Sequence, residues 1–211
     1  MSKSAEENTV KERNLVLNLS DADVKKLCNK AWSADLSVNG LIEAFIADLV
    51  DGACTNGSDE RMLANQWYER CWFGMFPRKT LIRYLIEHEE MDGFLDELEV
   101  KELADDSIKT IEKEISTGVM SGSAGNYTWK DIVYGDGKPC YDSREDWELS
   151  QKECIEQEQE ILEAAEQEIK EIWERFLYWT DEKDLSLSEE IQKVKQYESA
   201  LSCLMKGKSN V

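Results

Sequence analysis

The scarcity of helix-breaking residues constrains the fold of this chain most. Only two prolines and eleven glycines occur among 211 residues, which favours long helices over many short strands. Apolar residues recur at helical spacing along 145–180, and this pattern predicts one long helix. Its predicted inward-facing residues are Ile155, Ile161, Leu162, Ala165, Ile169, Ile172, Trp173, Phe176 and Leu177.

The same periodicity predicts further helices at about 59–74, 77–90, 92–115 and 185–205. Pro77 suits the first turn of the second of these helices. The two C-terminal helices are expected to form an antiparallel helical hairpin. Residues 116–144 are expected to be irregular, with a possible small β-hairpin near 127–141, around Gly135-Asp136-Gly137. The predicted fold is therefore mainly α, with an acidic helical domain over 58–211.

A different pattern precedes this domain. Residues 1–13 are polar and are predicted to form a flexible arm. The next residues alternate, with Leu15, Leu17 and Leu19 on one face, which is typical of a half-buried strand. Ser20 and Ser37 are then placed to cap two helices, at about 21–33 and from Val38 onward. The turn-rich stretch "CTNGSDE", 54–60, is the best candidate for a domain boundary.

This order of one short strand and two capped helices over residues 14–50 resembles the ribbon-helix-helix family, and it predicts a separate module over residues 14–53. The resemblance implies that two chains pair their strands into an antiparallel ribbon and form a dimer, whose ribbon enters the major groove of DNA. It implies base contacts from the outward residues of the strand, flanking contacts from the two cations before it, and a phosphate at the second helix N-terminus. A dimer that binds no DNA is the alternative. The candidate DNA-binding residues are Lys11, Arg13, Asn14, Val16, Asn18, Ser37 and Val38.

Charge argues for a different kind of partner. The chain has 45 Asp and Glu against 25 Lys and Arg, a formal net charge of −20. Such a polyanion is repelled by phosphate backbones and by anionic membranes, so a membrane is not expected as a partner. Segments 87–114 and 151–184 each carry twelve acids, against three and four bases. This composition suits a basic partner, or it serves solubility alone.

Glutamates of the long helix recur three, four or eight residues apart, so they are expected to lie on one helix face. Carboxylates at this spacing on a rigid rod imitate the phosphates of nucleic acid. An ordinary solvated helix face is the alternative. The candidate partner-binding residues are Asp96, Glu97, Glu153, Glu156, Glu160, Glu163, Glu171 and Glu174.

No motif of an enzyme occurs: the sequence lacks GxGxxG, a P-loop lysine and a nucleophile elbow. The single histidine, His88, is expected at the surface, and six widely spaced cysteines without a CxxC pair make a zinc site improbable. We therefore expect no catalysis, no cofactor and no metal. Without an apolar leader or a run of about 18 apolar residues, we expect a cytoplasmic protein of a bacterial host with reduced thiols.

In its general character, which is small, acidic, helical and free of catalytic motifs, the chain is similar to the anti-CRISPR proteins of phages and mobile elements. This similarity implies a non-catalytic inhibitor whose acidic helices occupy a basic nucleic-acid-binding surface of a CRISPR nuclease and block DNA binding. The alternative is a dimeric ribbon-helix-helix regulator that binds operator DNA, as repressors and antitoxins do. An oligomeric scaffold is a third possibility.

Overall fold

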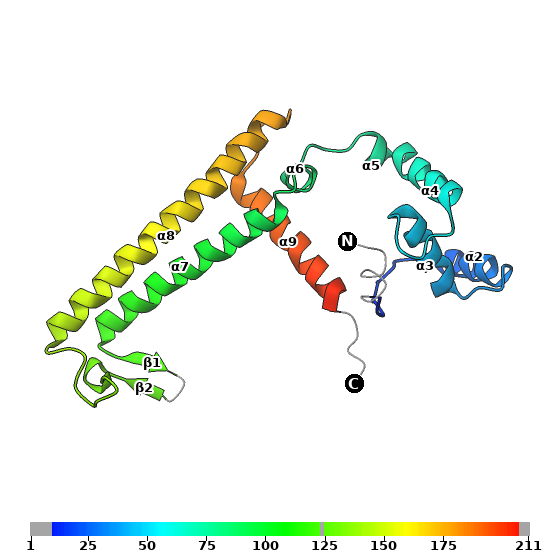
Figure 1. The fold of residues 1–211 in the computed structure, drawn as a ribbon. Coiled ribbons are helices and arrows are strands. Elements are labelled where there is room, and N and C mark those ends of the chain that lie inside the picture. The colour runs from blue at the N-terminus through cyan, green and yellow to red at the C-terminus, as the bar shows by residue number, and fades with distance from the viewer. Residues whose placement is uncertain (1–9, 123–124, 207–211) are drawn as a thin grey trace. The chain divides into compact units, whose positions relative to one another are not determined.

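The computed structural model describes residues 10–122 and 125–206, and most of them form helices, as the sequence predicts (Figure 1). By its contacts the chain divides into two compact units. The first unit consists of Met1–Arg78 together with Ile191–Val211, and the second is Lys79–Glu190. The helical class of the fold is therefore confirmed.

The first unit contains the helices α2 (Asp21–Trp32), α3 (Val38–Leu49), α4 (Ser58–Arg70) and α5 (Trp72–Met75). The hydroxyl oxygens of Ser20 and Ser37 accept hydrogen bonds from the third backbone N–H of α2 and α3, at 3.2 and 3.0 Å. Each cap satisfies a donor that the helix itself leaves unpaired. Both predicted caps are thus confirmed. The remaining helix, α9 (Leu187–Lys206), contains residues of both units.

The predicted strand at the start of the ribbon-helix-helix segment is not formed. Residues 10–20 have no regular secondary structure, and the first described element is α2. Leu15, Leu17 and Leu19 are 54%, 58% and 48% exposed. The physical reason is that an isolated strand gains stability only by pairing, and this single chain offers no second strand there. Of the predicted arm 1–13, residues 1–9 lie outside the described residues.

The turn-rich stretch 54–60 lies inside the first unit, so the two units do not meet at the boundary that composition suggests. The carboxylate of Asp48, which is 7% exposed, accepts a hydrogen bond from the Thr55 hydroxyl at 2.8 Å. It also accepts hydrogen bonds from the backbone and side-chain N–H groups of Asn56, at 2.8 and 2.9 Å. These bonds fix the connection to α3, because they satisfy a buried charge that would otherwise be costly.

The second unit is built on two long helices that lie side by side, α7 (Met91–Thr117) and α8 (Arg144–Trp179) (Figure 1). Their buried side chains form an apolar seam. Along the C-terminal half of α8 these residues follow one another at intervals of four, three and four, which is the spacing of a coiled coil. The buried residues of this seam are Phe94, Leu98, Ala104 and Ile108 of α7, and Ala165, Ile169, Ile172 and Phe176 of α8.

The two helices are antiparallel. Glu90, just before α7, binds Arg175 near the end of α8 at 3.1 Å, whereas Ser107, farther along α7, donates to Glu158, earlier in α8, at 3.1 Å. The sequence predicted that 145–180 would pair with 185–205, whereas the structure pairs α8 with α7. Periodicity shows that a helix has an apolar face but does not identify the helix that covers it. In the structure the seam of α8 is filled by α7.

A short helix, α6 (Leu81–Glu87), contacts both α7 and α8. The prediction placed its start at Pro77, which lies outside the helix. Thr80 is the cap, because its hydroxyl accepts a hydrogen bond from the backbone N–H of Arg83 at 3.3 Å. The carboxylate of Glu190, 2% exposed, accepts another from the N–H of Leu81 at 3.2 Å. A distant acid therefore helps to set the start of this helix.

Between α7 and α8, the strands β1 (Met120–Gly122) and β2 (Gly125–Tyr127) pair in an antiparallel sheet, followed by the short 3-10 helix η1 (Trp129–Asp131). The predicted hairpin near 127–141 is present only as a turn with a single bridge between Val133 and Pro139. Gly137, with φ +82°, allows this reversal. The regular sheet lies earlier in the chain than predicted.

Candidate functional site

The six predicted glutamates of α8 lie on one exposed face of the helix. At about 100° per residue they fall within a sector of about 80°, opposite the residues that α8 buries against α7. At about 1.5 Å per residue, the row extends over about 32 Å. We call this row the acidic stripe, and it consists of Glu153, Glu156, Glu160, Glu163, Glu171 and Glu174.

The stripe keeps most of its charge free of nearby cations. Glu171 accepts a hydrogen bond from the amide of Gln167 at 2.8 Å, and Glu174 lies 3.9 Å from the Lys170 ammonium. Within residues 10–122 and 125–206, no ion pair or side-chain hydrogen bond is found for the other four glutamates. Because like charges one turn apart repel, these four glutamates do not contribute to the stability of α8.

Asp96 and Glu97, the other two predicted acids, lie on α7. Asp96 is exposed and Glu97 is half-buried. The structure does not bring them into the acidic stripe, since the stripe points away from α7. They add instead to the charge of the helical hairpin: α7 carries nine acids and three bases, and α8 carries twelve acids and four bases, so together they carry −14.

The predicted DNA-binding residues do not form a common surface in this chain. The Arg13 guanidinium donates hydrogen bonds to the carbonyl oxygen of Leu204, at 2.9 Å, and to that of Met205, at the end of α9. Ser37 is engaged in capping α3, and Val38, its first residue, is half-buried. The others are exposed in the segment without secondary structure: Lys11, Asn14, Val16 and Asn18.

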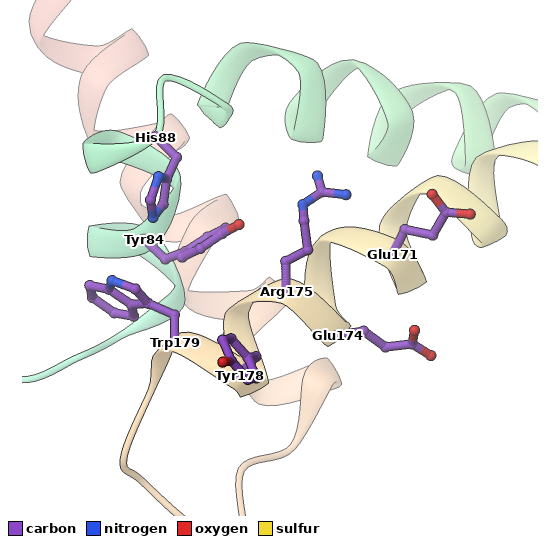
Figure 2. Close-up of a pocket in the computed structure, with 7 residues that line it drawn as sticks. All are labelled: Tyr84, His88, Glu171, Glu174, Arg175, Tyr178 and Trp179. Carbon is purple, nitrogen blue, oxygen red and sulfur yellow. The ribbon is translucent and has the colours of Figure 1, made fainter.

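An open cleft of about 590 Å³ lies where α6 meets the C-terminal end of α8, within the second unit (Figure 2). Glu171 and Glu174 of the acidic stripe belong to its lining, so the cleft and the stripe are continuous. Four of the other five lining residues carry an aromatic ring. We call this site the aromatic cleft, and it is lined by Tyr84, His88, Glu171, Glu174, Arg175, Tyr178 and Trp179.

The aromatic cleft has one side of packed rings, at Tyr84, and one side exposed to solvent, at Tyr178. The ring of Tyr84, 5% exposed, lies with its centroid 4.3 Å from that of His88 and 5.7 Å from that of Trp179. Rings at these distances and inclinations attract one another and hold their positions. Tyr178, in contrast, is 95% exposed. A large apolar ring is thus presented to solvent at the entrance of the cleft.

Arg175 lines the cleft and is already paired with a carboxylate. Its guanidinium donates hydrogen bonds to both carboxylate oxygens of Glu90, at 3.2 and 3.1 Å. The Tyr84 hydroxyl, which points toward Arg175 in Figure 2, raises the pKa of Arg175 by hydrogen bonding, and Glu90 raises this pKa further. Arg175 therefore stays charged, and its charge is balanced within the protein.

Two more cations lie near the ring of Trp179. The Lys79 ammonium and the Arg83 guanidinium carbon are 5.5 and 5.7 Å from its centroid, which is within the range of cation–π attraction. Lys79 forms an ion pair with Asp181 at 2.6 Å, and Arg83 forms one with Glu87 at 2.6 Å. These cations fix Trp179 and have carboxylate partners of their own, as Arg175 does.

The sequence did not predict the aromatic cleft. The helical periodicity assigns most of the apolar residues in the run "WERFLYW", 173–179, to the buried face of the long helix, and it gives no sign of a cleft. A usable signal was that Tyr178 follows Glu174 by four residues, which puts a large aromatic ring on the acidic face. His88, predicted at the surface, is indeed exposed, but its ring rests on Tyr84.

Among the described residues, no group of three or more His, Cys, Asp or Glu side chains is placed to hold a metal ion. None of the helices described is long and apolar enough to cross a membrane. No protein-family model matches the chain, and comparisons with curated proteins and with solved structures found no match either. The fold and the site define a mainly helical protein with an acidic antiparallel helical hairpin, and the functional argument rests on its own residues.

Proposed function

We propose that this protein is a non-catalytic inhibitor of the anti-CRISPR kind. It binds a basic nucleic-acid-binding surface of a CRISPR nuclease through the acidic helices and thereby blocks DNA binding. The observation that carries this proposal is the acidic stripe, in which exposed carboxylates are ordered along one face of a helix.

The charge density of the helical hairpin supports this mechanism. At about 1.5 Å per residue, the 36 residues of α8 extend over about 54 Å. The net charge of −14 on α7 and α8 then corresponds to one charge per about 4 Å. One strand of a duplex carries one phosphate per about 3.4 Å of axis, and both strands together carry one per about 1.7 Å. The hairpin thus matches a single strand rather than a whole duplex.

The uniform sign of the charge is what distinguishes this proposal from solubility alone. Any helix that buries one face carries its charges on the other, but solubility is served equally well by charges of both signs, whereas the stripe consists of acids alone. Packing of α8 on α7 holds the backbone of the stripe in place, so binding to a basic groove orders only the glutamate side chains and not the helix. Complementary charge also accelerates encounter, and this effect weakens as salt increases.

The test is inhibition of a purified RNA-guided DNA nuclease, loaded with its guide, in a binding assay with labelled target duplex. The natural chain should co-elute with the nuclease–guide complex and prevent retention of the duplex. The triple variant Glu156→Lys, Glu160→Lys, Glu163→Lys should inhibit at least tenfold more weakly, because three attractive contacts become repulsive.

A matched control changes the net charge equally on the exposed face of α7, through Asp92→Lys, Glu99→Lys and Asp106→Lys. This control should retain most of the inhibition. Equal loss in both variants would show that only total charge matters, and unchanged inhibition in the stripe variant would refute the mechanism. Absence of binding across a panel of such nucleases would remove the proposed target.

A second candidate function is a dimeric ribbon-helix-helix regulator that binds operator DNA. The observation in its favour is the row of exposed leucines at positions 15, 17 and 19, directly before two capped helices. A second copy would cover these leucines if the two segments paired as strands.

Sedimentation of the full chain tests this second candidate first. A dimer that Leu17→Asp converts to a monomer would support it, and a natural chain that is monomeric at every concentration would exclude it. DNA binding is tested by retention of a palindromic duplex at low salt. Asn18→Ala should abolish this retention while the dimer persists, because in a ribbon-helix-helix regulator Asn18 would contact a base.

A further inference from the structure

The aromatic cleft combines two features at the end of the acidic stripe. Glu171 and Glu174 supply carboxylates, and Tyr178 supplies an open ring, one turn after Glu174 and two turns after Glu171. All three residues come from α8, whose position is fixed by its seam with α7. Figure 2 shows Glu171 and Glu174 on one side of Arg175, and Tyr178 and Trp179 on the other.

The charges of the cleft favour a cation over an anion. Arg175, Lys79 and Arg83 each form an ion pair with a carboxylate of the second unit. In the part of the chain that the structure describes, Glu171 accepts a hydrogen bond from the neutral amide of Gln167, and Glu174 forms an ion pair with the exposed Lys170 at 3.9 Å. An entering anion would therefore meet one carboxylate that accepts only a neutral donor and one whose ion pair is as long as 3.9 Å, whereas a cation would be attracted.

We propose that the aromatic cleft binds an arginine side chain of the protein partner. The guanidinium lies against the ring of Tyr178 and donates hydrogen bonds to the carboxylates of Glu171 and Glu174. This inference rests on the proposed function for the identity of the partner. The guanidinium site itself rests only on the cleft and its side chains.

Arginine fits this site better than lysine does. Its planar group stacks on an aromatic ring and donates to two carboxylates at once, and it is more weakly hydrated than an ammonium. Known ligand sites have volumes of about 300–1,000 Å³, so the cleft can take the whole side chain with part of its peptide. An arginine from a nucleic-acid-binding surface would thus anchor one end of the acidic stripe.

The test is a titration of the full chain with N-acetyl-L-arginine methylamide, followed by nuclear magnetic resonance of the Trp179 indole N–H. A saturable shift at Trp179 is expected, and the lysine analogue should bind at least threefold more weakly. The double variant Glu171→Gln, Glu174→Gln should lower the affinity about tenfold, because it removes both charged acceptors. Tyr178→Ala should lower the affinity about threefold.

The matched control is Glu153→Gln with Glu156→Gln, which removes the same charge at the other end of the stripe. It should change the affinity less than twofold. Equal losses in the two double variants, equal binding of the lysine analogue, or a shift that does not saturate would each overturn the arginine site. Because this titration needs no nuclease, a chain that binds the probe but inhibits no nuclease would refute only the proposed function.

Discussion

A single charge reversal in the acidic stripe, Glu160→Lys, should make the protein more stable. Glu160 follows Glu156 by four residues and precedes Glu163 by three, so it has a like charge on each neighbouring turn. Exposed pairs of this kind change helix stability by about 0.2–0.5 kcal/mol each. Reversal replaces two repulsions by two attractions, so the expected gain in the free energy of unfolding is about 1–2 kcal/mol.

The assay is thermal unfolding followed by circular dichroism at low salt. For a chain of this length, about 1 kcal/mol corresponds to a rise in Tm of about 2–4 °C. Glu160→Gln is the matched control and should give about half of the gain, because it removes the repulsion without adding attraction. At about 1 M salt the Debye length falls to about 3 Å, so most of the gain should disappear.

The refuting result is a Tm that does not rise at low salt, or one that rises equally at about 1 M salt. Either outcome would show that the carboxylates do not repel one another as their positions on α8 require. The same variant should inhibit a nuclease more weakly although it is more stable. A gain in stability with a loss of binding is expected here, because like charges that attract a basic partner also repel one another in the free protein.

Three further changes test the packing and the polar contacts. Asp48→Asn should lower Tm at neutral pH. Hydrogen bonds from Asn56 and Thr55 lower the pKa of Asp48 below its ordinary value of 3.8, so this stabilisation is present above pH 3.8 and lost as pH falls through the lowered pKa. The two Tm curves should therefore converge at the acid end of a pH series. Phe176→Ala should lower the free energy of unfolding in urea by about 3–5 kcal/mol, because this ring is fully buried, and a loss below about 1 kcal/mol would contradict the packing. Ser143→Ala should lower it by about 1 kcal/mol, because the Ser143 hydroxyl accepts a hydrogen bond from the N–H of Asp146 at 3.0 Å, and Ser143→Asp should retain the cap.

Most predictions that depend on residues close together in the sequence were confirmed. Ser20 and Ser37 cap helices because a side-chain oxygen reaches an N–H three residues away, and no other part of the chain is needed. The long helix at 145–180 follows from its own periodicity and is found at Arg144–Trp179. Pro77 was misleading because several positions near a helix start accept proline, and Thr80 provides the cap.

Predictions that depended on distant contacts were less successful. The stretch 54–60 looks like a linker by composition, but the buried carboxylate of Asp48 binds it. The strand at 14–19 has the right alternation but no partner strand in the single chain. The aromatic cleft needs Tyr84 of α6 beside Trp179 of α8, and these residues are far apart in the sequence.

The sequence by itself determined the long helices, the caps of α2 and α3 and the spacing of the glutamates, because these depend on residues within one or two turns. Only the tertiary structure decided that α7 covers the apolar face of α8, and therefore that the acidic stripe points away from it. It also decided that α6 closes one wall of the aromatic cleft. The reason is that an apolar face is attracted to any apolar face of suitable shape, so its partner is chosen by the packing of the whole unit.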